Sequence, residues 1–448
     1  MMSREHRVRR RDVLRASAAG AALAGFAILP RHVLGGPGET APSEKVNLAF
    51  IGVGNRGWQL VQGMQHHNVV ALCDVDATFL AKAAGRFEKA RTYRDFQKML
   101  DAEQKRIDAV VVATPDHVHV VASVMAMKMG KHCYTEKPLG HNIHEVREAA
   151  RVARRYGLAT QLGNAGHAGH NYRGVVELIK AGTIGEVREV HAWCDNEWDE
   201  PPRVAKTRRG RDRPKDRPPV PEYLDWDLWL GPAPERPYHP AYHPISWRGW
   251  WDFGNGRLGD MGCHLIDLPF TALDLKAPAT VETQGPKAHS ESAPPWLIST
   301  WTFAAQGDRP PVELTWYDGN KRPELPSDVK PPDSRWPWFV LFVGADGMLI
   351  AGMEAFKLYP EEKFAGVRRP QVLRGPSHAD EWLTACKTGG PTGCHFDYAG
   401  PLTETVLLGT VAHRAGEKLQ WDAKAMKVTN CPVANQFLRR EYRQGWTL

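Results

Sequence analysis

The chain has 448 residues, more than one ordinary hydrophobic core holds, so about two domains plus an N-terminal segment are expected. Its formal net charge is +7, and residues 1–40 carry seven arginines against three acids. The remaining residues therefore hold only +3, which is too little and too dispersed to indicate a nucleic-acid-binding protein. We interpret the basic, proline-rich stretch at residues 201–221 as a solvated loop.

Residues 1–40 have the layout of an export signal. Arg10 and Arg11 precede an uncharged run of small and apolar residues at 16–29. This pattern is typical of a twin-arginine signal, which predicts export of the folded protein to the periplasm. The alternative is an amphipathic helix of the fold, but the run has no polar face. No clear A-x-A cleavage site follows, so the leader is either removed or kept as an uncleaved anchor, and we expect membrane contact only through it.

The first chemical motif follows an apolar run at residues 46–51. Gly52, Gly54 and Gly57 have the spacing G-x-G-x-x-G, which allows a tight turn and close approach of backbone to a pyrophosphate. A second apolar run at 68–73 leads into Asp74, where a carboxylate binds ribose hydroxyls and repels a 2′-phosphate. The pattern predicts a dinucleotide site and favours NAD over NADP, with Arg56 as the alternative phosphate partner.

Strand and helix patterns alternate up to residue 162, which predicts a doubly wound parallel sheet. Ligands of such sheets lie at the carboxyl ends of the strands, so the loops at Thr114-Pro115 and Glu136-Lys137 should border the dinucleotide. The predicted strands cover residues 46–51, 68–74, 107–113, 132–135 and 158–162. The predicted helices cover residues 77–89, 117–129 and 143–156.

The pattern changes after Gly185. Alternating runs at 187–194, 296–303, 312–317 and 338–343 predict a largely antiparallel sheet. Helices are expected at 173–181, 380–387 and 402–419. The predicted organisation is therefore α/β, with an export signal at 1–40, a Rossmann domain at 41–165 and a substrate-binding and oligomerisation domain of α+β type at 166–448.

Two groups of side chains carry candidate chemistry. Lys137 follows a predicted strand end, where it can hydrogen-bond a substrate hydroxyl and lower its pKa. Asp260 and His264 are four residues apart and share a face if helical, so the carboxylate could orient the imidazole as a general base. A helix-capping Asp with a structural His is the alternative. The seven cysteines include no C-x-x-C, and no further ligands have clear spacing, so no metal is expected.

The motifs occur together in an order that resembles the Gfo/Idh/MocA oxidoreductase family, over about residues 45–420. The resemblance implies a Rossmann domain, a second domain with a large open-faced sheet, sugar-like substrates and homo-oligomers such as dimers or tetramers. It rests on the glycine turn, Cys73-Asp74-Val75-Asp76, Thr114-Pro115, Glu136-Lys137-Pro138 and Gly259-Asp260-Met261-Gly262-Cys263-His264.

The resemblance assigns catalytic roles to Lys137, Asp260 and His264, and adds Asn164 and His167 to these three as substrate contacts. In this hypothesis His264, steadied by Asp260, takes the proton of a sugar or polyol hydroxyl, and hydride passes to the nicotinamide. The residues expected to bind the cofactor are Gly52, Gly54, Asn55, Arg56, Gly57, Asp74, Thr114, Pro115, His119, Glu136, Lys137 and Asn164.

Two other functions stay open at this stage. Some exported relatives keep NAD bound and recycle it, so that transient oxidation, elimination, water addition and re-reduction together hydrolyse a glycoside. The same residues would serve that reaction, and NAD would then be tightly bound. A protein that only binds a dinucleotide or sugar is the alternative of another class.

Overall fold

The computed structural model describes residues 44–194, 212–372 and 375–448, of which the described residues from Val46 to Leu448 belong to one compact unit. The leader and most of the basic loop at 201–221 lie outside the described residues. Within the described ranges, no helix combines the length and the apolar character that crossing a bilayer requires.

The N-terminal half is built on a six-stranded, fully parallel sheet with the strand order β3-β2-β1-β4-β5-β6. The strands are β1 (Asn47–Ile51), β2 (Asn68–Cys73), β3 (Arg91–Tyr93), β4 (Ala109–Val112), β5 (His132–Thr135) and β6 (Thr160–Leu162). The helices between them are α3 (Asn55–Gly63), α4 (Ala77–Arg86), α5 (Phe96–Glu103), α6 (Asp116–Lys128) and α7 (Ile143–Tyr156). Every residue of β4 is buried, as expected when helices cover both faces of a parallel sheet.

The predicted doubly wound sheet is confirmed, with two elements that the sequence pattern does not reveal. β3 has only three residues and two of them are exposed, so it lacks an apolar run. α5 follows it, and the side chain of Asp95 caps this helix by accepting a hydrogen bond from the backbone N–H of Gln97.

The C-terminal half contains a nine-stranded sheet with the order β13-β12-β11-β7-β10-β9-β8-β14-β15. Only the β7–β10 pair is parallel, so the prediction of a mostly antiparallel sheet is confirmed. The strands are β7 (Val187–Cys194), β8 (Thr280–Gln284), β9 (Ile298–Phe303), β10 (Val312–Tyr317), β11 (Trp338–Gly344), β12 (Met348–Ala351), β13 (Phe356–Tyr359), β14 (Leu419–Asp422) and β15 (Lys427–Val428).

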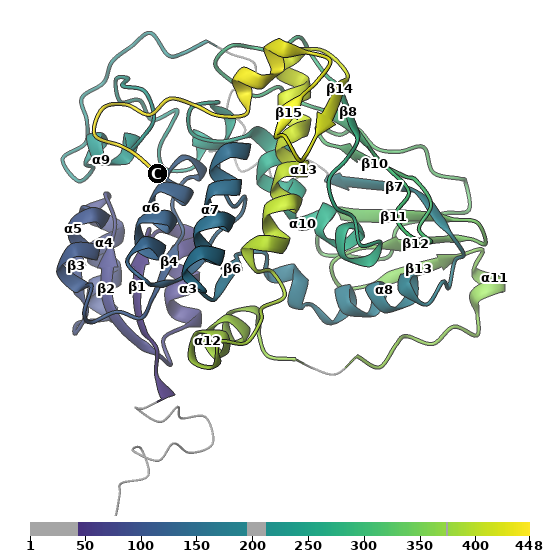
Figure 1. Cartoon of the computed structure of the whole chain (residues 1–448), viewed down its shortest axis with the longest axis horizontal. Coiled ribbons are helices and arrows are strands. Elements are labelled where there is room, and N and C mark those ends of the chain that lie inside the picture. The colour runs from purple at the N-terminus through teal and green to yellow at the C-terminus, as the bar shows by residue number, and fades with distance from the viewer. Residues whose placement is uncertain (1–43, 195–211, 373–374) are drawn as a thin grey trace, which may run out of the picture. The chain divides into compact units, whose positions relative to one another are not determined.

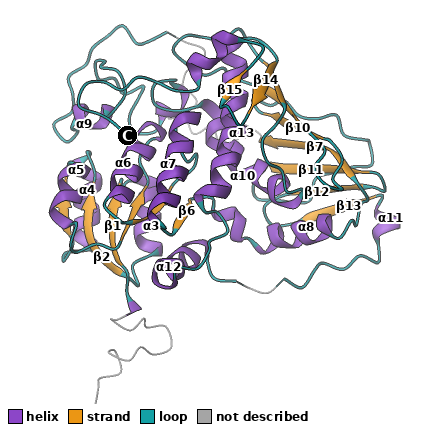
Figure 2. Cartoon of the chain, in the orientation of Figure 1, coloured by secondary structure: helices purple, strands orange, loops and turns teal. Residues whose placement is uncertain are grey.

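Helices join the two sheets, as Figures 1 and 2 show. α7 packs on α13, α13 packs on α10, and α10 and α13 cover one face of the nine-stranded sheet. The helical elements of this half are η2 (Ala165–Ala168), α8 (His170–Lys180), α9 (Trp226–Leu230), η4 (Ser246–Gly249), α10 (Gly256–Ala272), α11 (Glu361–Phe364), α12 (His378–Thr388), α13 (Phe396–Ala415) and η5 (Pro432–Phe437). The predicted boundary at 165/166 lies at the start of η2 and stays a prediction.

α13 differs from the helix predicted at 402–419. It begins six residues earlier, before Pro401, because Phe396 and Ala399 are buried and this packing compensates for the hydrogen bond that the proline cannot donate. It ends at Gly416, which has a φ of +71°, and Leu419 already starts β14. Burial in the tertiary structure therefore sets the ends of α13, which Pro401 and Gly416 alone do not determine.

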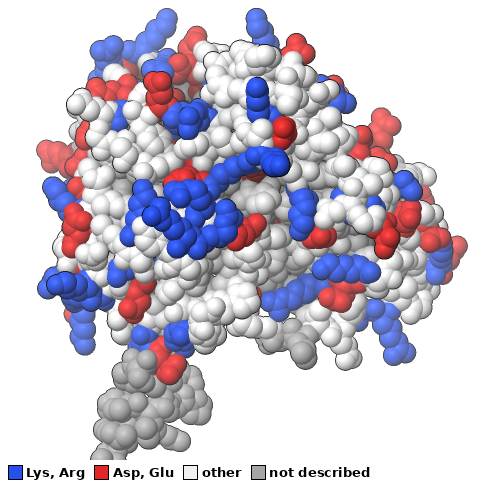
Figure 3. Space-filling model, in the orientation of Figure 1, with Lys and Arg blue, Asp and Glu red and all other residues white. Residues whose placement is uncertain are grey.

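Three arginines of α7 are exposed, Arg151, Arg154 and Arg155, and Figure 3 shows Lys and Arg side chains gathered near the centre of the view. Two of these arginines are paired with carboxylates. Arg151 lies 2.6 Å from Glu148, and Arg154 contacts Asp397 of α13. These pairs neutralise part of the local positive charge.

Candidate active site

The glycine turn after β1 has a shape that only glycine permits at two positions. Gly52 has a φ of +83°, and a Cβ on it would lie 2.6 Å from the carbonyl oxygen of Ala113. A Cβ on Gly57 would lie 2.0 Å from the carbonyl oxygen of Gly52, a separation that real Cβ atoms do not show. α3 begins at Asn55, so its unpaired N–H groups lie at this turn. The turn therefore fits the pyrophosphate of a dinucleotide.

Asp74 lies directly after β2 and faces the same turn. Its Oδ2 accepts hydrogen bonds from the backbone N–H groups of Val53 (2.8 Å) and Gly54 (3.2 Å). Burial raises the pKa of Asp74 to about 6, although these backbone hydrogen bonds act to lower it. The carboxylate is thus placed at the edge of the turn, as a ribose ligand should be.

The side chain of Arg56 forms an ion pair within the protein. Its Nε donates to Oε1 of Glu136 over 2.8 Å, and Glu136 is buried after β5. In the sheet, β5 lies on the opposite side of β1 from β2, which precedes Asp74. This ion pair disfavours Arg56 as the partner of a 2′-phosphate beside Asp74, and the role of Arg56 toward the cofactor stays a prediction.

The predicted cofactor contact at His119 also needs correction. His119 is buried on α6, and its Nδ1 and Nε2 each lie 2.8 Å from a backbone carbonyl oxygen, those of Pro138 and Thr114. Both ring nitrogens therefore face the protein, and the neutral ring, which has one N–H, donates to one of the two carbonyl oxygens at a time. His119 ties the Thr114-Pro115 loop to the loop that carries Lys137, so it positions the site rather than offering a ligand to the cofactor.

Lys137 and Asp260 meet between the two halves. The Nζ of Lys137 donates to both Oδ1 and the backbone oxygen of Asp260, each over 2.6 Å, and Nε of Arg248 lies 3.2 Å from the same Oδ1. Burial alone would raise the pKa of Asp260, but the positive charges of Lys137 and Arg248 hold it well below its usual range. Asp260 is therefore a permanent carboxylate that fixes the lysine.

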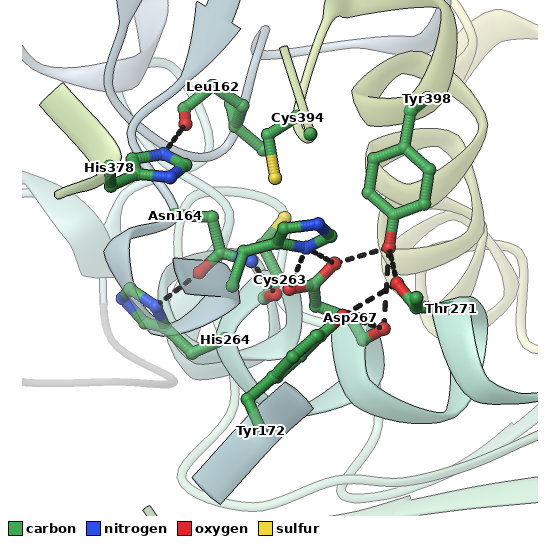
Figure 4. Close-up of polar contacts among 12 residues, drawn as sticks. Leu162, Asn164, Tyr172, Cys263, His264, Asp267, Thr271, His378, Cys394 and Tyr398 are labelled. Carbon is green, nitrogen blue, oxygen red and sulfur yellow. Dashed lines mark hydrogen bonds and ion pairs between the residues drawn. The ribbon is translucent and has the colours of Figure 1, made fainter. Parts of the chain in front are cut away.

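His264 has a different partner from the one predicted. Its Nδ1 lies 2.9 Å from Oδ1 of Asn164, whose Nδ2 donates to the backbone oxygen of Cys263 over 2.8 Å (Figure 4). Asp260 instead binds Lys137, because the loop after β5 brings the ammonium group against the start of α10. The prediction that Asp260 steadies the His264 ring was therefore wrong.

Asn164 decides the protonation of His264. A backbone carbonyl can only accept, so the amide nitrogen of Asn164 must face Cys263 and its oxygen must face the imidazole. Nδ1 of His264 then carries the hydrogen, which leaves Nε2 as an acceptor. Burial first, and then the charge of Lys137, lower the pKa of His264 to about 3. Asn164 is fully buried, so it positions the histidine and contacts no substrate.

His167 is partly exposed, and one of its ring nitrogens is bound within the protein. Its Nδ1 lies 3.0 Å from Oδ2 of Asp267. The hydroxyl of Tyr398 donates to the same carboxylate (Figure 4). Burial would lower the pKa of His167, but Asp267 raises it overall. The donor atoms of His167, Asp267 and Cys394 lie within 4.8 Å of one another, so the described residues do contain a group of metal-ligand type that the sequence spacing does not show.

The structure adds site residues that sequence reasoning missed. Asp116, the first residue of α6, is buried and interacts electrostatically with Lys137 and Asp260. Burial raises the pKa of Asp116 to about 7, although Lys137 acts to lower it. Its place directly after Thr114-Pro115 was the available signal. Arg248 of η4 and Trp338 of β11, whose ring lies beside that of His264, gave none, because they lie far along the chain from Lys137.

Two models of one protein family match this chain. Residues 46–164 match the NAD-binding Rossmann fold of the Gfo/Idh/MocA oxidoreductases, and residues 208–309 match their C-terminal alpha/beta domain. The chain belongs to the Gfo/Idh/MocA oxidoreductase family. The resemblance seen in the motifs is confirmed, and so is the expectation that the first domain is of the NAD-binding type.

Known proteins resemble parts of this family member. It is 30% identical over 122 residues to uncharacterized oxidoreductase ORF334 of Rhizobium meliloti, covering 27% of this chain and 36% of that protein. It is 26% identical over 215 residues to alpha-N-acetylgalactosaminidase of Tannerella forsythia, covering 43% and 45%. The chain therefore spans less than half the length of these curated relatives.

The WlbA dehydrogenase of Bordetella pertussis, solved in complex with NADH and UDP-GlcNAcA, is similar in structure. Its TM-score is 0.58 at 15% sequence identity, over 84% of this chain and 99% of that one. At this level of identity the similarity shows that the fold is shared.

Proposed function

We propose that the protein is an NAD-dependent oxidoreductase that acts on a secondary hydroxyl of a sugar, polyol or glycoside. The observation that carries the proposal is the meeting of Lys137, Asp260 and His264 beside the carboxyl ends of the NAD-binding sheet. The sugar-like ligands named for WlbA and the N-acetylgalactosaminidase support the substrate class.

Lys137 is suited to hold the substrate oxygen. An ammonium group has three N–H donors, and two of them are used on Asp260. The third is free to donate to a hydroxyl, and the positive charge lowers the pKa of that hydroxyl. Because Asp260 fixes Nζ from two directions, the donor is oriented before substrate binds.

His264 is suited to take the hydroxyl proton. Among the described residues, no hydrogen-bond partner is recorded for its Nε2, and Asn164 keeps this nitrogen unprotonated. The low pKa keeps the ring neutral throughout the physiological range. The ring is therefore unprotonated and able to accept, but a pKa this low makes it a weak base, so the stabilisation of the developing alkoxide by Lys137 has to supply much of the driving force for the proton transfer.

NAD, when bound, supplies the hydride acceptor. The glycine turn at Gly52–Gly57 and the carboxylate of Asp74 would hold its pyrophosphate and ribose. A 2′-phosphate would meet the negative charge of Asp74, and Arg56 is already paired with Glu136. These observations support NAD over NADP.

A glycosidase that recycles tightly bound NAD is the second candidate. The similarity to alpha-N-acetylgalactosaminidase, over 43% of this chain, favours it. Lys137 and His264 would perform the same oxidation step, and the oxidised sugar would then lose its substituent, add water and be reduced again. A protein without catalysis is disfavoured, because the three catalytic positions are all occupied by reactive residues.

The proposal also covers where the protein is exported and how its subunits assemble. Arg10 and Arg11, followed by an uncharged apolar run, support export to the periplasm by the twin-arginine route. A dimer or tetramer, as in the family that the sequence resembles, is the assembly we propose.

The test begins with the nucleotide released on denaturing the purified protein, which we expect to be NAD(H). A panel of sugars, polyols and glycosides is then incubated with and without added NAD. NADH formation supports the oxidoreductase, and release of the aglycone without net NADH supports the recycling glycosidase. Release of NADP would contradict the cofactor assignment.

The kinetics of the variant Lys137→Ala are then measured on whichever substrate the protein turns over. We expect kcat/KM to fall by about 10² to 10⁴, because the donor to the substrate oxygen is lost. Lys128→Ala on the exposed side of α6 is the control and should leave turnover unchanged. Unchanged turnover in Lys137→Ala would contradict the catalytic role of Lys137, whereas absence of turnover of every substrate by the unaltered protein would favour the non-catalytic alternative.

A further inference from the structure

Two carboxylates lie close to Lys137, and they differ in their partners. Oδ1 of Asp260 lies 2.6 Å from Nζ of Lys137 and 3.2 Å from Nε of Arg248. Asp116, the first residue of α6, is only 4% exposed and interacts electrostatically with the same two cations and with Asp260. Its side chain hydrogen-bonds that of Asn255, and no ion pair of Asp116 is recorded among the described residues. When two carboxylates share a site, the one without a direct cationic partner takes up a proton more readily.

The fold places Asp116 beside Lys137. β4 and β5 are parallel neighbours, so the residues that follow them lie at the same edge of the sheet, where this fold binds its ligands. One turn into α6, the ring nitrogens of His119 each lie 2.8 Å from a carbonyl oxygen, those of Pro138 and Thr114, which keeps the two loops together. The backbone therefore holds the carboxyl and ammonium groups near each other before any ligand binds.

Oxidation of a hydroxyl by NAD releases one proton, and the other groups of the site are unsuited to keep it at neutral pH. Lys137 is paired as an ammonium group with Asp260, so it has no lone pair to offer. The positive charges of the site hold the pKa of Asp260 well below its usual range, and burial lowers the pKa of His264 to about 3. Burial raises the pKa of Asp116 to about 7, although Lys137 acts to lower it.

The remaining titratable neighbours of Asp116 are held neutral. On its own helix, burial lowers the pKa of His117 to about 3 and also lowers that of His119. On α10, burial raises the pKa of the Cys263 thiol, which interacts electrostatically with Asp116, to about 12. Among all these groups, Asp116 is therefore the one whose charge changes near neutral pH.

We propose that Asp116 is the proton store of the active site: it takes up the proton that oxidation of the bound hydroxyl releases, and it returns this proton when the carbonyl is reduced. This inference rests on the proposed oxidation. The hydride leaves the carbon for NAD, and the electron pair of the O–H bond becomes the second bond of the carbonyl group. The proton is taken by Nε2 of His264 and passes to Asp116 through Lys137, whose ammonium group gives up one proton as it gains another.

The affinities for the two forms of the cofactor test this role without any substrate. The positive nicotinamide of NAD+ and a proton on Asp116 disfavour each other, whereas uncharged nicotinamide in NADH permits the proton. As the pH rises through about 7, the ratio of the Kd of NAD+ to the Kd of NADH should therefore fall by about tenfold. Isothermal titration of the full chain measures both constants.

Asp116→Asn is the variant for this measurement. Asparagine keeps the size of the side chain but cannot ionise, so the ratio of the two constants should no longer change with pH. Asp101→Asn, at an exposed position of α5, is the control and should keep the pH dependence of the unaltered protein. Asp116→Glu is the conservative variant and should keep a pH-dependent ratio.

The pH profile of turnover gives a second readout once a substrate is known. In the unaltered protein, kcat/KM for oxidation should fall about tenfold per pH unit below about pH 7, and Asp116→Asn should lack this fall. If His264 alone kept the proton, no fall would appear above about pH 4, because its pKa is about 3.

A ratio of the two dissociation constants that stays constant with pH in the unaltered protein overturns the inference, even if Asp116→Asn does not fold. An equal pH dependence in Asp116→Asn overturns it as well. A pH-dependent ratio without NADH formation from any sugar or polyol would leave the link between Asp116 and the cofactor and overturn the proposed oxidation. NADH formation with a constant ratio would overturn only the proton store.

Discussion

Two histidines, one on α10 and one on η2, differ in the atom that faces their Nδ1. His264 faces the amide oxygen of Asn164, and His167 faces the carboxylate of Asp267. A neutral partner combined with burial leaves His264 uncharged, whereas a carboxylate partner raises the pKa of His167. His264 is therefore a neutral ring that can accept a proton at Nε2. His167 instead forms a charged pair with Asp267, which links η2 to α10.

Asn164→Ala tests the role of the amide. The change frees the His264 ring to adopt either tautomer and removes the partner of two buried polar groups, so we expect kcat to fall about 10- to 100-fold. The dissociation constant for NAD should stay within about twofold, because the amide touches no cofactor in this arrangement. Steady-state kinetics and NAD titration separate the two effects.

Asn68→Ala is the control for that variant, since Asn68 is exposed and bonds only to Asn47 among its recorded side-chain partners. A loss of NAD binding in Asn164→Ala with kcat unchanged would contradict the positioning role.

At the scale of elements, η2 and α10 are joined by two parallel links. Asn164 precedes η2 and binds His264, and His167 within η2 binds Asp267, one turn further along α10. Lys137 adds a third link from the loop after β5 to the first turns of α10. α10 is therefore the element on which the parts of the site converge.

The turn between β1 and α3 gives a prediction at the same scale. Gly57→Ala places a methyl 2.0 Å from the backbone oxygen of Gly52, so the turn must shift and we expect NAD affinity to fall by at least about tenfold. Isothermal titration with NAD measures the change.

Gly63→Ala, in the last turn of the same helix, meets no atom within 4 Å. It should retain NAD affinity and raise the free energy of unfolding by up to about 1 kcal/mol, because alanine favours the helix. Equal NAD affinity in the two variants would show that the turn does not hold the pyrophosphate.

At the scale of the whole molecule, the C-terminal segments complete both halves of the residue 46–448 unit. α13 packs between α7 and α10, and α12 brings Trp382 against Tyr134 of the parallel sheet, with ring centroids 5.6 Å apart. Gln161 of β6 donates to the backbone oxygen of His378 at the start of α12. The two halves are therefore expected to unfold together rather than as separate domains.

Burial of histidines predicts acid sensitivity. It lowers the pKa of His117 and His264 to about 3 and of His413 to about 4, so between pH 6 and 4 these groups are protonated only when the chain unfolds. Asp74 and Asp116, with pKa values raised to about 6 and about 7, act in the opposite direction. Counted over these five groups, the unfolded chain binds about one proton more than the folded chain. The free energy of unfolding should therefore fall by about 1.4 kcal/mol for each unit by which the pH is lowered.

Urea unfolding at pH 7, 6 and 5 measures this. The midpoint should fall with pH, and the lowered pKa values of His119 and His378 act in the same direction. A midpoint that stays constant or rises toward pH 5 would contradict the prediction.

The sequence by itself determined the class of each half. The glycine spacing, the apolar runs and Asp74 are local patterns, so they fix a strand-turn-helix and its dinucleotide chemistry wherever the rest of the chain lies. Lys137, Asp260 and His264 were found because their types and neighbours form motifs. The short strand β3 was missed because it is mostly exposed and lacks an apolar run, and the true ends of α13 were missed because burial decides them and not local propensity.

The tertiary structure decided which side chains meet. Asp260 and His264 share a helix face, yet Lys137 takes the carboxylate and Asn164 takes the imidazole, since both arrive from loops of the other sheet. His119 and His167 have the residue type of ligands, but carbonyl oxygens of two nearby loops face His119, and the carboxylate of Asp267, far along the chain, engages His167. A hydrogen-bond partner far along the chain leaves no periodic trace in the sequence, so only the fold could assign it.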